Sequence, residues 1–167
     1  MTTGEPFGET RATLARPDGT PIESWGSGAA PGVSWRTLLS SDRTPTSELS
    51  VGTCDVEPGG ELSRHRHERA EVYHFLSGAG EVGVNEELFP VRAGDTVFVP
   101  GNAWHRISNT ADKTLRLFYC FATDSFADVV YTYGDGSTWQ AEPAAGSGSA
   151  TNVPPARQYP PSARSRN

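Results

Sequence analysis

Residues 59–78 read GGELSRHRHERAEVYHFLSG and contain most of a predicted metal site. His65 and His67 are two residues apart, so on an extended strand their side chains project to the same face. Glu71 follows at the start of an apolar run, and His105 lies in a second segment punctuated by glycine and proline. Three imidazoles and one carboxylate can hold a divalent transition metal and leave coordination positions for water or substrate. The sequence therefore predicts an open metal site formed by His65, His67, Glu71 and His105.

The composition indicates one all-β domain. The chain has 167 residues, with 18 Gly and 13 Pro, and short β-rich runs alternate with turn residues. A net charge of -6 argues against a nucleic-acid surface. Cys54 and Cys120 lie in expected strands, where most such cysteines are buried and reduced, although a disulfide stays open. No apolar stretch has the length of a signal peptide or membrane span, so we expect a soluble cytoplasmic protein without a membrane partner.

About ten short strands are expected between the turns. They span residues 33–39, 48–56, 62–67, 71–76, 81–84, 88–91, 96–99, 104–109, 114–122 and 128–133. Closing or stacking such sheets removes exposed edges, so we expect a jelly roll or small barrel over residues 31–135. Residues 1–30 and 136–167 are rich in Pro, Ser, Gly and Thr or Ala, and we expect a flexible arm and a disordered tail.

The residue spacing resembles the two motifs of the cupin superfamily. The first motif is matched by Gly59, His65, His67, Glu71 and Gly78, and the second by Gly94, Pro100, His105 and Asn109. The 15 residues between the two motifs are typical of small single-domain cupins of the cupin_2 type. Asn102 stands where the family usually has glycine, and Asn is the other residue that best tolerates a left-handed backbone. The resemblance implies a cupin jelly-roll barrel (double-stranded β-helix) whose metal is bound by the four residues named above.

Side-chain alternation predicts which residues surround the metal. Tyr73 shares a face with Glu71, whereas His74 has the opposite parity and should point away. The residues expected to line a substrate pocket are Phe75, Phe98, Trp104, Ile107 and Asn109. A phenol beside a dication loses its proton more easily, so Tyr73 is a candidate general base. Filling the core is the alternative role for Tyr73.

The resemblance implies several reactions, because the cupin fold alone does not fix function. Residues 35–38, 65–67, 71–73 and 121–126 look like segments of the small cupin-type dimethylsulfoniopropionate lyases. In those enzymes the metal holds the substrate carboxylate, and a tyrosine at the position of Tyr73 is a proposed base for β-elimination. We therefore expect a metal-dependent lyase acting on a small carboxylate, with Tyr73 and Glu71 in catalysis. The alternatives are an Fe(II) dioxygenase, a cyclase or isomerase of natural-product biosynthesis, and a non-catalytic small-molecule-binding cupin.

The expected cofactor is one divalent transition metal. Three His and one Glu suit Fe(II), Mn(II), Zn(II), Ni(II), Co(II) or Cu(II), and cellular availability often decides among them. The resemblance also implies a homodimer, formed by sheet extension through residues 33–39.

Overall fold

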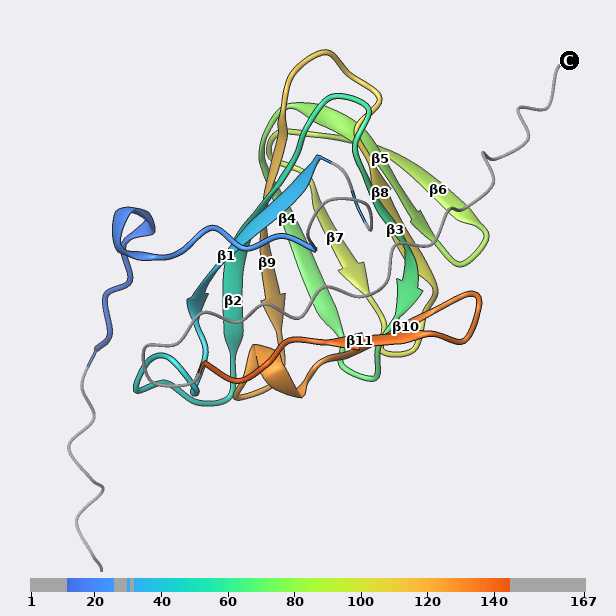
Figure 1. Ribbon diagram of the computed structural model, residues 1–167. Helices are drawn as coiled ribbons and strands as arrows, with labels where there is room; N and C mark the ends of the chain where they lie inside the picture. The colour runs from blue at the N-terminus through green and yellow to red at the C-terminus, as the bar shows by residue number, and fades with distance from the viewer. Residues whose placement is uncertain (1–11, 26–29, 31, 145–167) are drawn as a thin grey trace, which may run out of the picture.

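The computed structural model describes residues 12–25, 30 and 32–144, which form two facing antiparallel β-sheets (Figure 1). The elements are η1 (Pro17–Gly19), β1 (Val33–Leu39), β2 (Ser50–Val56), β3 (Glu61–Arg66), β4 (Glu71–Ser77), β5 (Ala79–Val84), β6 (Glu87–Arg92), β7 (Thr96–Val99), β8 (His105–Ser108), β9 (Leu115–Phe121), η2 (Phe126–Asp128), β10 (Val130–Tyr133) and β11 (Thr138–Gln140). One sheet has the order β1-β2-β9-β4-β7 and the other β11-β10-β3-β8-β5-β6. No helix in the described ranges is long and apolar enough to cross a membrane.

The core lies between the two sheets and follows from strict alternation along the strands. In β9 the buried positions are Leu115, Leu117, Tyr119 and Phe121, while the residues between them are more exposed. In β4 the buried positions are Glu71, Tyr73 and Phe75. One face of each sheet is therefore buried against the other sheet, which confirms the predicted all-β jelly roll.

The ten expected strands are all present, with ends within two residues of the predicted bounds. The ordered barrel also extends beyond residues 31–135 in both directions. β11 pairs with β10, with Tyr131 opposite Trp139, and Trp25 from the expected N-terminal arm is buried in the core. Both extensions rest on tryptophans that pack on the barrel. Residues 12–25, 30 and 136–144 of the two expected arms are described, and the expected flexibility of residues 1–11, 26–29 and 145–167 concerns positions outside the described residues.

Two turns fix the geometry of the cupin-like motifs. Gly78 has φ +82°, and a Cβ there would overlap the carbonyl oxygen of Thr114, so only glycine fits without strain. Asn102 has φ +63°, the left-handed conformation expected for the residue that replaces the family glycine. The Asn102 N–H donates to the carbonyl oxygen of His67 at 2.7 Å. This hydrogen bond ties the turn of the second motif to a histidine of the first.

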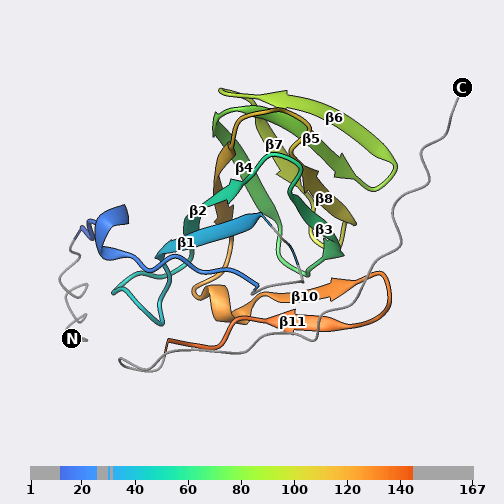
Figure 2. The ribbon, with the colours of Figure 1, turned by 45° about the horizontal axis from the view of Figure 1, so that its top comes forward.

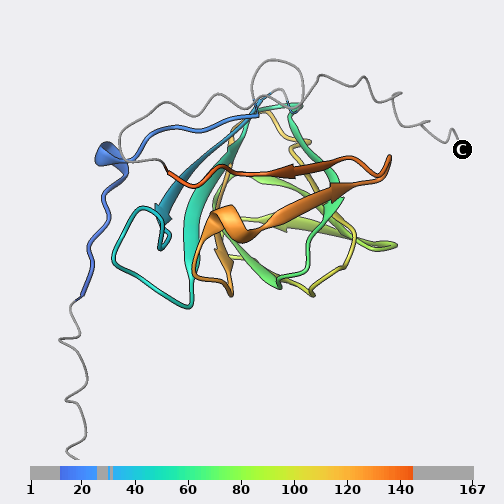
Figure 3. The ribbon, with the colours of Figure 1, turned by 60° about the horizontal axis from the view of Figure 1, so that its bottom comes forward.

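The β10–β11 hairpin lies across one end of the barrel, and the described segment before β1 runs beside β1 (Figures 2 and 3). Trp25 packs on Trp35 with ring centroids 4.3 Å apart and on Trp139 at 5.3 Å. Glu23 pairs with Trp35 in an isolated antiparallel bridge, so part of the outer edge of β1 is covered by the same chain. The homodimer through β1 stays a prediction. The Glu23–Trp35 bridge leaves less of the β1 edge free to pair with a second copy of the chain.

Candidate metal centre

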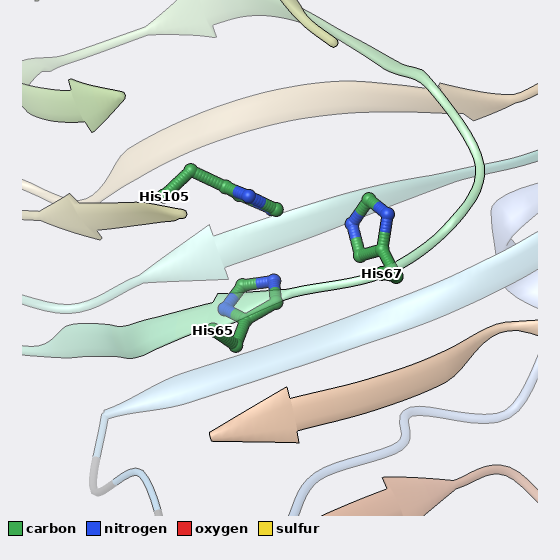
Figure 4. A group of neighbouring side chains, drawn as sticks. All are labelled: His65, His67 and His105. Carbon is green, nitrogen blue, oxygen red and sulfur yellow. The ribbon is translucent and has the colours of Figure 1, made fainter. Parts of the chain in front are cut away.

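Three histidines meet inside the barrel (Figure 4). His65 lies in β3 and His105 begins β8, and the two residues are directly opposite each other in the β3–β8 ladder. His67 follows the end of β3. One ring nitrogen from each histidine lies within 4.8 Å of the others, and all three side chains are buried. The strand pairing and the HxH spacing together bring the three imidazoles to one point.

Glu71 reaches the same point from the opposite sheet, as the first residue of β4. Its Oε2 lies 3.2 Å from Nε2 of His67 and 3.6 Å from Nε2 of His105. None of the four residues is more than 3 % exposed. The structure thus brings together all four residues that the sequence predicts as metal ligands.

Each imidazole is oriented by a carbonyl oxygen two residues away. The Nδ1 atoms of His65, His67 and His105 lie 2.7, 2.7 and 2.8 Å from the carbonyl oxygens of Ser63, Arg69 and Ala103. A carbonyl oxygen only accepts, so Nδ1 of each ring carries a proton and Nε2 is the nitrogen left to bind a metal. Metal-binding histidines in proteins are commonly held in this way.

Two of the Nε2 atoms lack hydrogen-bond partners among the described residues. They belong to His65 and His105. Nε2 of His67 lies 3.2 Å from a carboxylate oxygen of Glu71, close enough for one cation to contact both atoms. A cation between these atoms would satisfy all of them, and the donor set therefore fits a divalent transition metal.

The charge states also fit a cation. Burial lowers the pKa of His65 well below its ordinary value, and the nearby His105 lowers it further, so His65 is neutral. Burial alone would raise the pKa of Glu71, but its contacts with His105 and His67 outweigh burial and lower it. A neutral imidazole and an ionised carboxylate are the forms that bind metals.

A small cavity of about 20 Å³ lies beside this cluster. Its walls are mostly aromatic and aliphatic, and they are formed by Trp25, Trp35, Cys54, Leu62, Glu71, Tyr73, Ile107, Leu117, Tyr119, Phe126 and Tyr131. The hydroxyl of Tyr73 is buried and has no hydrogen-bond partner within the described ranges. Burial raises the pKa of Tyr73 well above its ordinary value, and the charge of Glu71 raises it further. Tyr73 therefore holds its proton unless a positive charge is placed nearby.

Of the five predicted pocket residues, Ile107 is the one that lines the cavity. Phe75 is fully buried in the core without lining it. The Asn109 side chain donates to two backbone carbonyl oxygens, which is a structural role. Phe98 is 62 % exposed on the outer side of β7, and Trp104 stacks against two arginine guanidinium groups near the surface. The cavity walls therefore do not include Phe98, Trp104 or Asn109.

The aromatic walls include residues that the sequence analysis did not select. The ring of Tyr131 stacks on His65, with centroids 4.7 Å apart and 30° between the planes. Trp35 is also a wall residue, and the alternation along β1 could have identified it as inward-facing. Trp25 gave no such signal, because its segment has no strand-like period. His74 points away as predicted and contacts Thr96 Oγ1 at 2.9 Å.

Comparison with known proteins identifies the domain. Residues 52–121 match the Cupin_2 family model, described as a cupin domain. Over these residues the chain is similar to cupin domains. It is 33% identical over 101 residues to dimethylsulfoniopropionate lyase DddW of Ruegeria pomeroyi, a match that covers 60% of this chain. The match covers 66% of the lyase, which is less than two thirds of its length.

Solved structures show the same fold. A cupin-2 domain protein of Rhodospirillum rubrum has a TM-score of 0.58 and 24% identity, and the match covers 72% of this chain and 80% of that protein. The polyketide cyclase RemF of Streptomyces resistomycificus has a TM-score of 0.59 and 17% identity, with 66% of this chain and 79% of that protein covered. At these identities the chain shares its architecture with both proteins, and activity is a separate question.

Proposed function

We propose that this cupin domain is a metal-dependent enzyme that acts on a small carboxylate. The leading reaction is a β-elimination of the dimethylsulfoniopropionate lyase type. The observation that carries this proposal is the buried hydroxyl of Tyr73, which has no partner in the described structure and lies on the same cavity as Glu71. The Tyr73 ring centroid lies 6.2 Å from that of His105. Sequence similarity to a lyase supports the choice of reaction.

The proposed ligands are His65, His67, Glu71 and His105. A divalent ion held by them supplies a Lewis acid that polarises a carboxylate and acidifies the adjacent C–H. Histidine and carboxylate ligands suit several first-row metals, so metal identity follows availability. Glu71 contributes negative charge, and the buried imidazoles exclude water from one side of the site.

Tyr73 is the proposed general base. Positive charge next to its hydroxyl opposes the effect of burial and favours the phenolate. The phenolate removes the α-proton of the substrate, the Cα–Cβ double bond forms, and the Cβ–S bond breaks. The sulfur leaves with the electron pair, so a sulfonium substrate yields a neutral thioether and an unsaturated acid. General-base catalysis of this kind contributes about 10²–10⁴-fold to a rate.

The test is release of dimethyl sulfide from dimethylsulfoniopropionate. Protein loaded with Fe(II), Mn(II) or Zn(II) is incubated with the substrate, and the headspace is assayed with and without oxygen. We expect activity in the native protein and in His74→Ala, and a loss of about 100-fold or more in Tyr73→Phe. No activity above a Glu71→Ala control refutes the lyase. Turnover of a tested carboxylate only in the presence of oxygen indicates a dioxygenase instead.

A further inference from the structure

The cavity beside the metal cluster is too small for a substrate in the described conformation. A volume of about 20 Å³ accommodates roughly one water molecule. A carboxylate with several further heavy atoms needs more room than this. A molecule that enters through this cavity can therefore reach Glu71 and Tyr73 only after one of its walls moves.

Trp25 is the wall residue with the weakest attachment through the main chain. Most of the other wall residues belong to strands that are paired along their length in the two sheets. Trp25 lies in the segment before β1, which Figure 1 shows beside that strand and which pairs with it through the Glu23–Trp35 bridge. The two hydrogen bonds of this bridge are 2.8 and 2.9 Å long. The Arg36 side chain also donates to the carbonyl oxygen of Thr20, at 2.5 Å. Segments with few backbone hydrogen bonds open at the lowest free energy.

Polar side-chain contacts hold this segment closed. The Arg43 guanidinium donates two hydrogen bonds to the Glu23 carboxylate, at 2.9 and 2.8 Å. The hydroxyl of Thr37 donates a third at 2.8 Å. Glu23 and Arg43 are each about a fifth exposed, at 22% and 20%. Water can therefore reach the Glu23–Arg43 pair, whereas Thr37 is buried.

We propose that Trp25 is a gating and specificity-determining residue, whose segment opens to admit a carboxylate to the metal cavity and whose indole limits the size of the bound molecule. The proposed limit on ligand size depends on the proposed metal site. The proposed opening of the Trp25 segment does not depend on it. The competing gate is the β10–β11 hairpin, because Trp139 packs on Trp25 from the other side.

Cys54 provides a direct measure of opening. It lines the same cavity, is a free thiol and is buried. Burial raises the pKa of Cys54, so its thiol is unreactive until the cavity opens. Cys120 is a free, half-buried thiol outside the cavity lining and serves as the internal control. The rate of alkylation by iodoacetamide at each cysteine is measured by peptide mass spectrometry.

Two variants shift the gate in opposite directions. Glu23→Gln weakens the contacts with Arg43, and we expect about tenfold faster alkylation of Cys54. Ser24 and Ser34 each lie one residue from the Glu23–Trp35 pair in the antiparallel register, and both are at least partly exposed. In the double variant Ser24→Cys/Ser34→Cys, oxidation should slow Cys54 alkylation at least about tenfold, and reduction should restore it. Cys120 should react at the same rate throughout.

Unchanged Cys54 rates in Glu23→Gln and in the oxidised double variant overturn the gate. If Trp139→Ala alone accelerates alkylation, the hairpin is the gate and the proposal is wrong. The size limit is tested with propionate and hexanoate binding to Co(II)-loaded protein, followed by visible absorption. Trp25→Phe should raise the hexanoate-to-propionate affinity ratio about tenfold, and an unchanged ratio overturns the size limit. If the alkylation rates show that the Trp25 segment opens but no lyase activity is found, the gate is supported and only the proposed reaction is refuted.

Discussion

Removing the Tyr73 hydroxyl should make the metal-free protein more stable while abolishing most of its activity. The hydroxyl is buried, and no hydrogen-bond partner is found for it in the described ranges. An unsatisfied buried polar group costs about 1–3 kcal/mol. In Tyr73→Phe the ring still fills its space, so we expect the free energy of unfolding to rise by about 1 kcal/mol. We take the lower end because the cavity has room for one water that can meet part of the demand.

The measurement is denaturant and thermal unfolding of chelator-treated protein. A gain of about 1 kcal/mol corresponds to about 2–4 °C in Tm for a chain of this size. Tyr119→Phe is the matched control, because Tyr119 faces Tyr73 across the β4–β9 ladder and is also buried. Its hydroxyl lies 3.2 Å from Thr37 Oγ1, so its removal should destabilise the protein by about 1 kcal/mol. Equal destabilisation by both changes would show that the Tyr73 hydroxyl has a partner, and the reasoning for a free base would fail.

Three further predictions follow from the site and the fold. Zn(II) or Co(II) should raise the Tm of the native protein and of His74→Ala but not of His105→Ala; an equal rise in all three refutes the proposed ligand set. Burial alone would raise the pKa of Asp42, but the hydrogen bonds that it accepts outweigh burial and lower it below 3.8. Asp42 therefore contributes stability above pH 3.8 that is lost as the pH falls through its lower folded-state pKa, and Asp42→Asn should flatten the acid limb of a stability–pH curve. An unchanged acid limb contradicts this assignment. Gly78→Ala should destabilise the fold by about 2 kcal/mol or more in urea titration, since Ala at φ +82° also meets a backbone carbonyl; a change under about 0.5 kcal/mol contradicts the described turn.

Much of the barrel could be predicted because its strands alternate cleanly. In β9 the apolar residues occupy every second position from Leu115 to Phe121, so the inward face follows from the sequence alone. The meeting of His65, His67, Glu71 and His105 was also predictable, because two spaced motifs constrain it. The role of these residues as ligands remains a proposal.

The errors have identifiable physical causes. Val99 is fully buried on β7, so Phe98, its neighbour, had to point outward, and the assignment of Phe98 to the pocket overlooked this alternation. Trp104 precedes His105 by one residue and has the opposite parity. Trp25 and β11 lie in segments whose composition resembles linkers, and only tertiary packing between distant tryptophans orders them. Such long-range contacts leave no local pattern in the sequence.

The carbonyl contacts of the three histidines have a consequence for metal uptake. Each Nδ1 is held by a carbonyl group only two residues away along the chain, so ring orientation is set locally rather than by the ion. An apo site that is already preorganised binds its ion without a coupled folding step, unlike a zinc finger. The protein should therefore be able to exchange one metal for another as a folded molecule, and its activity should depend on the metal supply of the cell in which it is made.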